Sequence, residues 1–201
     1  MILASGSPRR IEMMRQRGFD PIVMPSRIEE NLPGEMGMEQ TVMFLALKKA
    51  LSVETEYLCH EYTGIAEEKK YYEEDKANPL IIAADTIVYK DGVIGKPKDR
   101  ADAYRILKKL CGTEHFVATG VAIIEAGQPV RTVFACVTKV CFANYSDAEI
   151  EAYIDTEEPY DKAGGYAIQG SWGRFVDYYE GDYDNVIGFP WSRIASELEK
   201  L

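Results

Sequence analysis

Apolar and polar residues alternate along this chain with two different spacings, one typical of strands and one typical of helices. Short apolar runs bounded by glycine, proline or polar residues predict strands, and turns such as Asp91-Gly92 predict hairpins between some of them. Helical segments lie between other strands. This mixture predicts an α/β fold with a mixed, twisted sheet and flanking helices. The predicted strands cover residues 1–4, 19–24, 81–84, 87–89, 93–94, 115–125, 130–142 and 175–178.

The helices are predicted from apolar spacing together with capping signals. Ser7 followed by Pro8 is a strong helix start, and Ser146 with Glu149 has the spacing of a capping box. Residues 54–78 are rich in Glu, Lys and Tyr, so we expect a solvated segment on the surface. The predicted helices cover residues 7–18, about 38–53, 99–111, the residues after Ser146 and the residues after Pro190.

Composition limits the class of protein. A chain of 201 residues fits one domain with a sizeable core. Its net charge of −10 argues against binding a nucleic acid polymer. No window approaches the ~20 apolar residues of a membrane span, and the first residues lack the features of a signal peptide, so a cytoplasmic protein is expected.

The four cysteines form no CxxC pair and are expected to be reduced and buried. With only His60 and His115 a histidine-based site is improbable, and His115 is predicted to be a packed structural residue.

Asp85 interrupts the most apolar stretch of the chain, Ile81 to Val88. An unpaired buried carboxylate costs several kcal/mol. Asp85 therefore either serves a cation, a water network or a substrate, or it ends a strand and caps a turn. Glu29 and Glu30 could join Asp85 in holding a hard divalent ion such as Mg²⁺, although adjacent carboxylates in a turn are more often solvated.

Two other segments carry polar groups suited to a ligand. Residues 5–10 place hydroxyls and the guanidiniums of Arg9 and Arg10 at a helix N-terminus, where anions bind readily; the alternative is a capped helix with solvated arginines. Residues 158–170 combine three glycines with Gln169, whose amide both donates and accepts, although a flexible loop also fits this composition. Lys96 lies in a constrained Gly-Lys-Pro turn.

Taken together, these motifs resemble the Maf family over nearly the whole chain and in the same order. The resemblance implies one domain, residues 1–201, with the two-lobed Maf/HAM1 (inosine-triphosphatase-like) fold and a central substrate cleft between the lobes. The matching segments are Ser5-Gly6-Ser7-Pro8-Arg9-Arg10, Ala84-Asp85-Thr86, Gly95-Lys96-Pro97, residues 158–164, Ile168-Gln169-Gly170 and residues 186–190.

The resemblance also implies a function and a set of site residues. Maf proteins are nucleoside triphosphate pyrophosphatases, which release a monophosphate and pyrophosphate with a divalent metal cation, Mg²⁺ or Mn²⁺. Asp85 matches the proposed general base, and Glu30 matches another polar position of the family's pocket. We expect Asp85 and Glu30 to hold the metal, although the sequence does not rank Glu29 against Glu30 as the ligand. The substrate-binding positions that the resemblance implies are Ser7, Arg9, Arg10, Lys49, Thr86, Lys96, Asp161, Lys162 and Gln169.

Within the family, Arg9, Thr86 and Gln169 resemble the branch that acts on dTTP and UTP, including modified pyrimidine nucleotides, as a house-cleaning activity. The alternative branch acts on 7-methyl-GTP. A phosphohydrolase with Asp85 as nucleophile is disfavoured, because aspartyl enzymes with an Asp at a strand end typically carry a DxDxT motif, and here Ala83 stands two residues before Asp85. The family name is tied to septum formation, which keeps open a nucleotide-sensing regulator that does not hydrolyse. A nucleoside triphosphate is the expected partner, without a membrane, and a homodimer is a family-level expectation.

Overall fold

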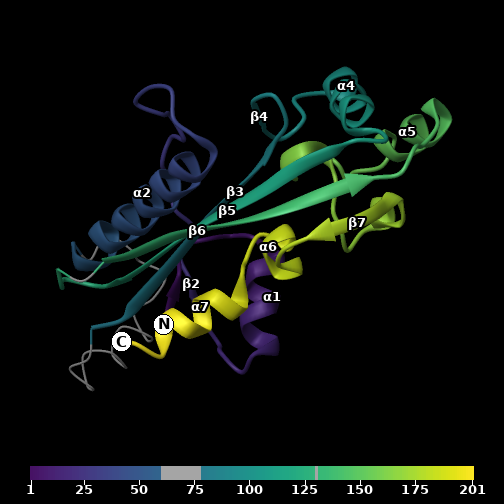
Figure 1. The fold of residues 1–201 in the computed structure, drawn as a ribbon. Coiled ribbons are helices and arrows are strands. Elements are labelled where there is room, and N and C mark those ends of the chain that lie inside the picture. The colour runs from purple at the N-terminus through teal and green to yellow at the C-terminus, as the bar shows by residue number, and fades with distance from the viewer. Residues whose placement is uncertain (60–77, 130) are drawn as a thin grey trace. The chain divides into compact units, whose positions relative to one another are not determined.

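The computed structural model describes residues 1–59, 78–129 and 131–201, and the chain forms two compact units. Unit 1 comprises residues 1–85, 120–135 and 191–201, and unit 2 comprises residues 86–119 and 136–190. Three long strands contribute residues to both units: β3 (Leu80–Tyr89), β5 (Glu114–Glu125) and β6 (Arg131–Phe142) (Figure 1). The substrate cleft stays a prediction.

Within the described residues, the strands form one seven-stranded sheet with the order β2-β1-β3-β5-β6-β7, in which β4 also pairs with β3. The short strand β1 (Ile2–Leu3) runs parallel to β2 (Ile22–Val23) and to β3, whereas β4 (Val93–Ile94) and β7 (Val176–Glu180) pair antiparallel with β3 and β6. The predicted mixed α/β sheet is therefore confirmed, although β1 and β2 are shorter than predicted.

The described residues of unit 1 form three helices with an apolar core against its strands. Helix α1 (Pro8–Gln16) follows Ser7 and ends before Gly18, whose φ of +84° suits a glycine after a helix. Helix α7 (Trp191–Leu198) begins directly after Pro190. Helix α2 (Met38–Leu58) packs Ala46, Ala50 and Val53 into a core with strand residues such as Ile2, Ile81 and Ala122. The predicted starts of these helices are confirmed.

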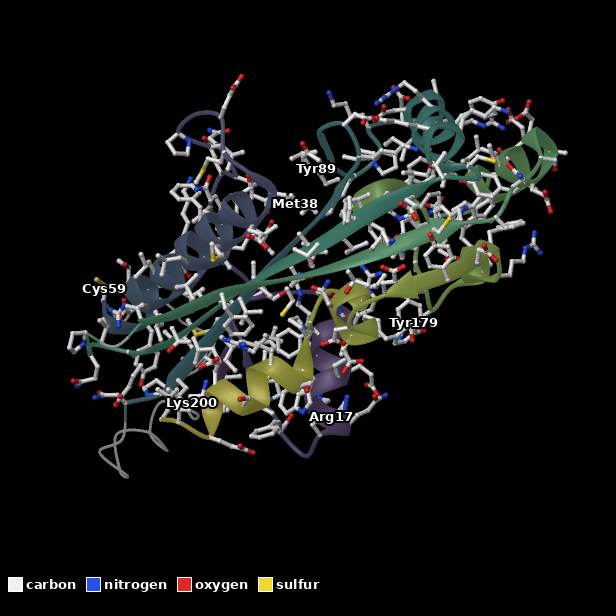
Figure 2. The ribbon with its side chains drawn as sticks, viewed as in Figure 1. Arg17, Met38, Cys59, Tyr89, Tyr179 and Lys200 are labelled. Atoms are coloured by element: carbon white, nitrogen blue, oxygen red, sulfur yellow. The ribbon has the colours of Figure 1, made fainter. Side chains whose placement is uncertain are left out.

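Helix α2 is longer than its sequence pattern indicated, since it continues past Val53 to Leu58 (Figure 2 labels Met38 and Cys59 at its two ends). The prediction of a solvated segment from residue 54 is wrong at its start. Glu54 is buried, and its carboxylate accepts hydrogen bonds from the Gly127 amide at 2.9 Å and from Arg131 Nη2 at 2.9 and 3.0 Å. Because Arg131 neutralises its charge, Glu54 can lie on the buried face of helix α2. Residues 60–77 of the predicted segment lie outside the described residues.

Gly120 of β5 allows the backbone of α2 to approach the sheet closely. A Cβ at this position would lie 2.2 Å from both the carbonyl carbon and the carbonyl oxygen of Val42, and 2.6 Å from the Met43 nitrogen. These backbone atoms cannot move aside as a flexible side chain would, so only glycine fits. Gly120 thereby sets the distance between β5 and the helix that carries Lys49.

Unit 2 has an aromatic core beneath helices α4 (Arg100–Leu110) and α5 (Asp147–Ile154). Trp172 stacks on Tyr153 with ring centroids 4.5 Å apart and meets Tyr145 edge-on at 4.8 Å. The predicted helix starts at residue 99 and after Ser146 are confirmed: the Asp99 carboxylate accepts from the Asp102 amide, and Ser146 and Glu149 form the predicted capping box. Helix α6 (Tyr183–Ile187), which the sequence analysis did not predict, is capped by Asp182.

Two predictions about buried residues have different outcomes. His115 is a packed residue as predicted: it is buried, its Nε2 lies 2.7 Å from Tyr166 Oη, and its ring packs on Phe142. The cysteines are less buried than predicted, because Cys59 is exposed and the other three are half-buried. Across residues 1–59, 78–129 and 131–201, no helix is long and apolar enough to cross a membrane.

Candidate active site

Asp85 lies inside strand β3, not at its end. The strand continues through Leu80–Tyr89, because Ile81 and Ile82 pair with β1 while Val88 and Tyr89 pair with β4. The two strands predicted on either side of Asp85 are therefore one, and the interpretation of Asp85 as a turn cap is wrong. Its carboxylate is 9% exposed, so it must be stabilised by a partner.

Lys49 supplies that partner and joins two carboxylates. Its Nζ, carried by α2, lies 2.5 Å from Asp85 Oδ1 and 2.7 Å from Glu30 Oε1, all within unit 1. The Lys49 side chain is 16% exposed and that of Glu30 is 59% exposed. The cluster therefore extends from a buried strand carboxylate to one that reaches solvent, with a single ammonium between them.

Arg10 adds a second cation to this cluster. Its Nη1 donates to the Ala84 carbonyl at 2.8 Å and to Ser5 Oγ at 3.1 Å, which fixes the guanidinium beside strand β3. Burial lowers the pKa of Arg10 to about 10, and the nearby charge of Asp85 opposes that shift. Arg10 therefore stays protonated at neutral pH.

Ser7 occupies the N-cap position of α1, but its hydroxyl makes no cap hydrogen bond to the described helix residues. Its backbone N–H instead donates to Ser5 Oγ at 3.2 Å, and the Ser7 carbonyl accepts from the Ile11 amide. The segment from Ser5 to Arg10 thus folds into a tight turn whose polar groups gather at the start of a helix. Helix N-termini favour anions because their first amides point outward.

Of the two adjacent glutamates, only Glu30 joins the cluster. The Glu29 carboxylate accepts from Asn31 Nδ2 at 2.9 Å, and its carbonyl accepts from Lys48 Nζ at 2.7 Å. Sequence alone could not rank these neighbours. The ion pair between Lys49 and Glu30 distinguishes them.

Arg9 lies in unit 1, in the first turn of α1. The other predicted site residues lie in unit 2, where two motifs that are distant in sequence meet. The Gly164 amide donates to the Gly95 carbonyl at 2.9 Å, which brings the Gly-Lys-Pro turn beside the glycine-rich segment. Gly164 has φ +73°, and a Cβ there would lie 2.7 Å from Val88 Cγ2, so glycine is required for this contact.

The side chains of these two motifs differ in how firmly they are held. Lys162 Nζ donates to the Glu158 carbonyl at 2.6 Å and contacts the Asp161 carboxylate, whereas the side chains of Lys96 and Gln169 are exposed. Thr86, the first residue of unit 2, is half-buried, and its hydroxyl lies 3.0 Å from Thr119 Oγ1.

Comparison with known proteins identifies the family. The Maf-like protein family model matches residues 1–201. The chain belongs to the Maf family. This Maf chain is 41% identical over 202 residues to a "dTTP/UTP pyrophosphatase" of Caldicellulosiruptor bescii, covering 100% of this chain and 94% of that protein. It is 40% identical over 199 residues to the protein of that name in Acetivibrio thermocellus, covering 99% and 94%.

A third relative of the same name, from Dictyoglomus turgidum, is 42% identical over 203 residues, covering 100% of the Maf chain and 95% of the relative. Among solved structures, that of the Staphylococcus aureus Ham1 protein aligns with 99% of the Maf chain and 97% of its own, with 13% identity and a TM-score of 0.46. A sequence identity and a TM-score this low support no conclusion about the fold or the function of the chain.

The carboxylates of this Maf protein fit a hard divalent cation. The described residues contain no group of three or more His, Cys, Asp or Glu side chains placed to hold a metal. Mg²⁺ does not require such a cage, because it is commonly bound by one or two carboxylates, waters and substrate phosphates. Glu30 and Asp85, which already share the charge of Lys49, supply that donor set.

Three polar residues of the Maf chain were not predicted from its sequence as site residues: Ser5, which begins a matched segment, Thr119 and Asn185. Ser5 Oγ receives hydrogen bonds from Arg10 and from the Ser7 amide. Thr119 and Asn185 are fully buried, and the Thr119 hydroxyl lies 3.0 Å from both Thr86 Oγ1 and the Asn185 carbonyl oxygen. The one signal for Thr119 was a lone hydroxyl within the apolar run of β5, and Asn185 directly precedes the matched segment 186–190.

Proposed function

We propose that this Maf chain is a nucleoside triphosphate pyrophosphatase that hydrolyses dTTP and UTP to the monophosphate and pyrophosphate. The observation that carries the proposal is the buried carboxylate of Asp85 held by Lys49, beside Glu30 and Arg10. The names of relatives at about 40% identity support the same activity. Modified pyrimidine nucleotides belong to the proposed substrate range.

Cleavage between the α- and β-phosphates needs a deprotonated water and neutralisation of the leaving pyrophosphate. Asp85 is the proposed general base, since its carboxylate is fixed in the strand by the Lys49 ion pair. Glu30 and Asp85 would hold the proposed Mg²⁺ or Mn²⁺, which polarises phosphate oxygens and lowers the pKa of bound water. Lys49 balances the charge of both carboxylates.

Each unit carries cations suited to phosphate oxygens, and these are the proposed substrate-binding cations. In unit 1, Arg9 and Arg10 extend from the first turn of α1, where the helix dipole also favours anions. Ser7 contributes a hydroxyl at the same helix terminus. In unit 2, the exposed Lys96 and the backbone-bound Lys162 add two more ammonium groups, and Asp161 holds Lys162 in place.

Arg9, Thr86 and Gln169 are the proposed residues that select the nucleotide. Gln169 can both donate to and accept from a pyrimidine edge, and Thr86 is proposed to face the base. Exchange of Gln169 for Glu, the residue typical of the 7-methyl-GTP branch, is expected to change the order of preference among nucleotides more than the turnover number. The cytoplasm is the proposed compartment.

The experiment that tests the proposal is pyrophosphate release from a panel of nucleotides with Mg²⁺ or Mn²⁺. The panel contains dTTP, UTP, CTP, 5-methyl-UTP, 7-methyl-GTP and dITP. We expect dTTP and UTP to be hydrolysed best. Preferred hydrolysis of 7-methyl-GTP would keep the enzyme class and overturn the specificity assigned to Arg9, Thr86 and Gln169. Binding without turnover of any nucleotide would support the sensing regulator instead.

A covalent phosphoenzyme would distinguish an aspartyl phosphohydrolase, in which Asp85 is the nucleophile, from the proposed mechanism, in which Asp85 is a base. The buried mid-strand position of Asp85 and its 2.5 Å contact with Lys49 favour a base over a nucleophile that must reach phosphorus. Denaturing the protein during turnover of UTP labelled in each phosphate should therefore leave no label on the chain. Label retained on Asp85 would support the aspartyl phosphohydrolase.

A further inference from the structure

Within unit 2, a chain of hydrogen bonds runs from Thr86 to helix α6. Thr86 Oγ1 lies 3.0 Å from Thr119 Oγ1, and Thr119 Oγ1 in turn lies 3.0 Å from the carbonyl oxygen of Asn185. Thr119 and Asn185 are both completely buried. Bulk water therefore does not compete for these hydrogen bonds.

The direction of each hydrogen bond in this chain follows from counting protons. A threonine hydroxyl has one proton to donate, and a backbone carbonyl can only accept. Thr119 must therefore donate its proton to the Asn185 carbonyl, so it can only accept from Thr86. Thr86 consequently donates its own proton to Thr119. In any other hydrogen bond, Thr86 Oγ1 must be the acceptor.

Asn185 is itself held firmly, so the end of the chain is fixed. Its carbonyl also accepts from the Gly188 amide at 3.0 Å. Its side-chain Nδ2 donates to the Val117 carbonyl at 3.0 Å and to Thr138 Oγ1 at 2.9 Å, and Thr138 donates its hydroxyl proton to the Asp182 carbonyl. Because both partners of Nδ2 are acceptors there, the amide orientation is determined as well.

We propose that Thr119 is a positioning residue that makes Thr86 an acceptor-only hydroxyl, and that Thr86 thereby selects bases with an N–H donor at N3. Uracil and thymine have this donor, whereas cytosine presents a lone pair at N3. A hydroxyl that cannot donate repels that lone pair and accepts well from an N–H. This inference rests on the proposed function, in which Thr86 faces the base.

The test compares the affinities of UTP and CTP, measured by calorimetry without metal so that no turnover is needed. Thr119→Val removes the hydroxyl and keeps the shape, which frees the Thr86 proton to rotate and donate to cytosine. We expect the preference for UTP over CTP to fall about tenfold in this variant. Thr119→Ser keeps the hydroxyl and should retain the preference. Thr119→Ala repeats the test if the valine variant does not fold.

Thr113→Val is the matched control. It removes another threonine hydroxyl of unit 2, one that donates to the Leu110 carbonyl at 2.9 Å, and the preference should be unchanged. A parallel loss of affinity for both nucleotides in Thr119→Val, or an unchanged preference in the folded variant, would overturn the inference. So would a wild-type protein that does not discriminate UTP from CTP.

Two further outcomes separate this inference from related ideas. If the preference between UTP and 3′-deoxy-UTP changes in Thr119→Val while that between UTP and CTP does not, the donor is a ribose hydroxyl and the assignment to the base is wrong. If the wild-type protein releases no pyrophosphate when metal is added, but shows the Thr119-dependent preference in binding, the proposed function fails while this inference stands.

Discussion

Lys49 Nζ lies 2.5 Å from Asp85 Oδ1, which joins helix α2 to the middle of strand β3 through one ion pair. The same ammonium reaches Glu30 at 2.7 Å. Helix α2 is in turn set against the sheet at Gly120. The position of Asp85, the proposed base, thus depends on contacts made by Lys49 of α2, by Glu30 and by Gly120 of β5, all within unit 1.

Replacing Lys49 by methionine should lower kcat by about 10²-fold, because the Asp85 carboxylate would lose the cation that fixes it and the phosphates would lose a charge. Steady-state kinetics with UTP measure the effect. Lys48→Met is the matched control, since the neighbouring ammonium donates to the Glu29 carbonyl and lies 6.0 Å from the centre of the Phe44 ring, and we expect less than about a twofold change, close to the noise of such a measurement. Equal losses in the two variants would argue against a specific role of Lys49.

Exchanging Glu30 for glutamine should raise the Mg²⁺ concentration needed for half-maximal activity by about tenfold, because a neutral amide is a weaker ligand for a hard cation. Titration of activity with Mg²⁺ at saturating UTP measures this. Glu29→Gln, one residue away, should leave the midpoint unchanged. A shift in the Glu29 variant but not in the Glu30 variant would contradict the assigned ligand.

Gly120→Ala should destabilise the protein by about 1–3 kcal/mol and lower kcat, because the added Cβ would collide with the Val42 carbonyl and displace α2 together with Lys49. Urea unfolding and kinetics on the same preparation measure both effects. Gly34→Ala is a suitable control, as an added Cβ there meets no atom within 4 Å. Normal stability of Gly120→Ala would contradict the close approach of helix and strand.

His115 gives a prediction about pH. Burial lowers its pKa from 6.5 to about 4 in the folded protein, so between these values the unfolded chain binds a proton that the folded chain does not. The stability contributed by neutral His115 is thus complete above pH 6.5 and lost as the pH falls toward 4, by about 3 kcal/mol in all.

Urea unfolding at pH 7.5 and pH 5 measures this dependence, and His115→Phe is the comparison because it keeps the ring but cannot titrate. The variant should lose less stability than the wild type on acidification. An identical loss in both proteins would mean that His115 does not contribute to the acid sensitivity of the fold.

Local patterns predicted most elements, because the evidence for them is local. Pro8 marks a helix start through its fixed backbone angle, and Asp99 and the Ser146–Glu149 box mark theirs through hydrogen bonds within a few residues. The structure has helices at all three places. The break predicted at Asp85 was wrong because pairing with β1 and β4 and the charge of Lys49 come from distant segments. Glu54 was misjudged for the same reason, since Arg131 is its partner.

The site was predicted unevenly. Motifs indicated Asp85, Glu30, Lys49 and Arg10, and the structure brings these four together in unit 1. It places Thr86, Lys96, Asp161, Lys162 and Gln169 in unit 2. The roles of Thr119 and Asn185 could not be inferred from the sequence. They depend on hydrogen bonds between residues that are distant in the chain, which a hydroxyl in an apolar strand or an amide in a short helix does not reveal.

The central claim is that Asp85 acts as the base in pyrophosphate release from pyrimidine nucleotides. Its most direct test is the ³¹P spectrum of the products formed from UTP by the wild-type protein and by Asp85→Asn, which keeps the side-chain shape. We predict UMP and pyrophosphate from the wild type and a loss of ~10²–10⁴ in turnover for the variant. UDP and phosphate as products, or near-normal turnover by Asp85→Asn, would contradict the account.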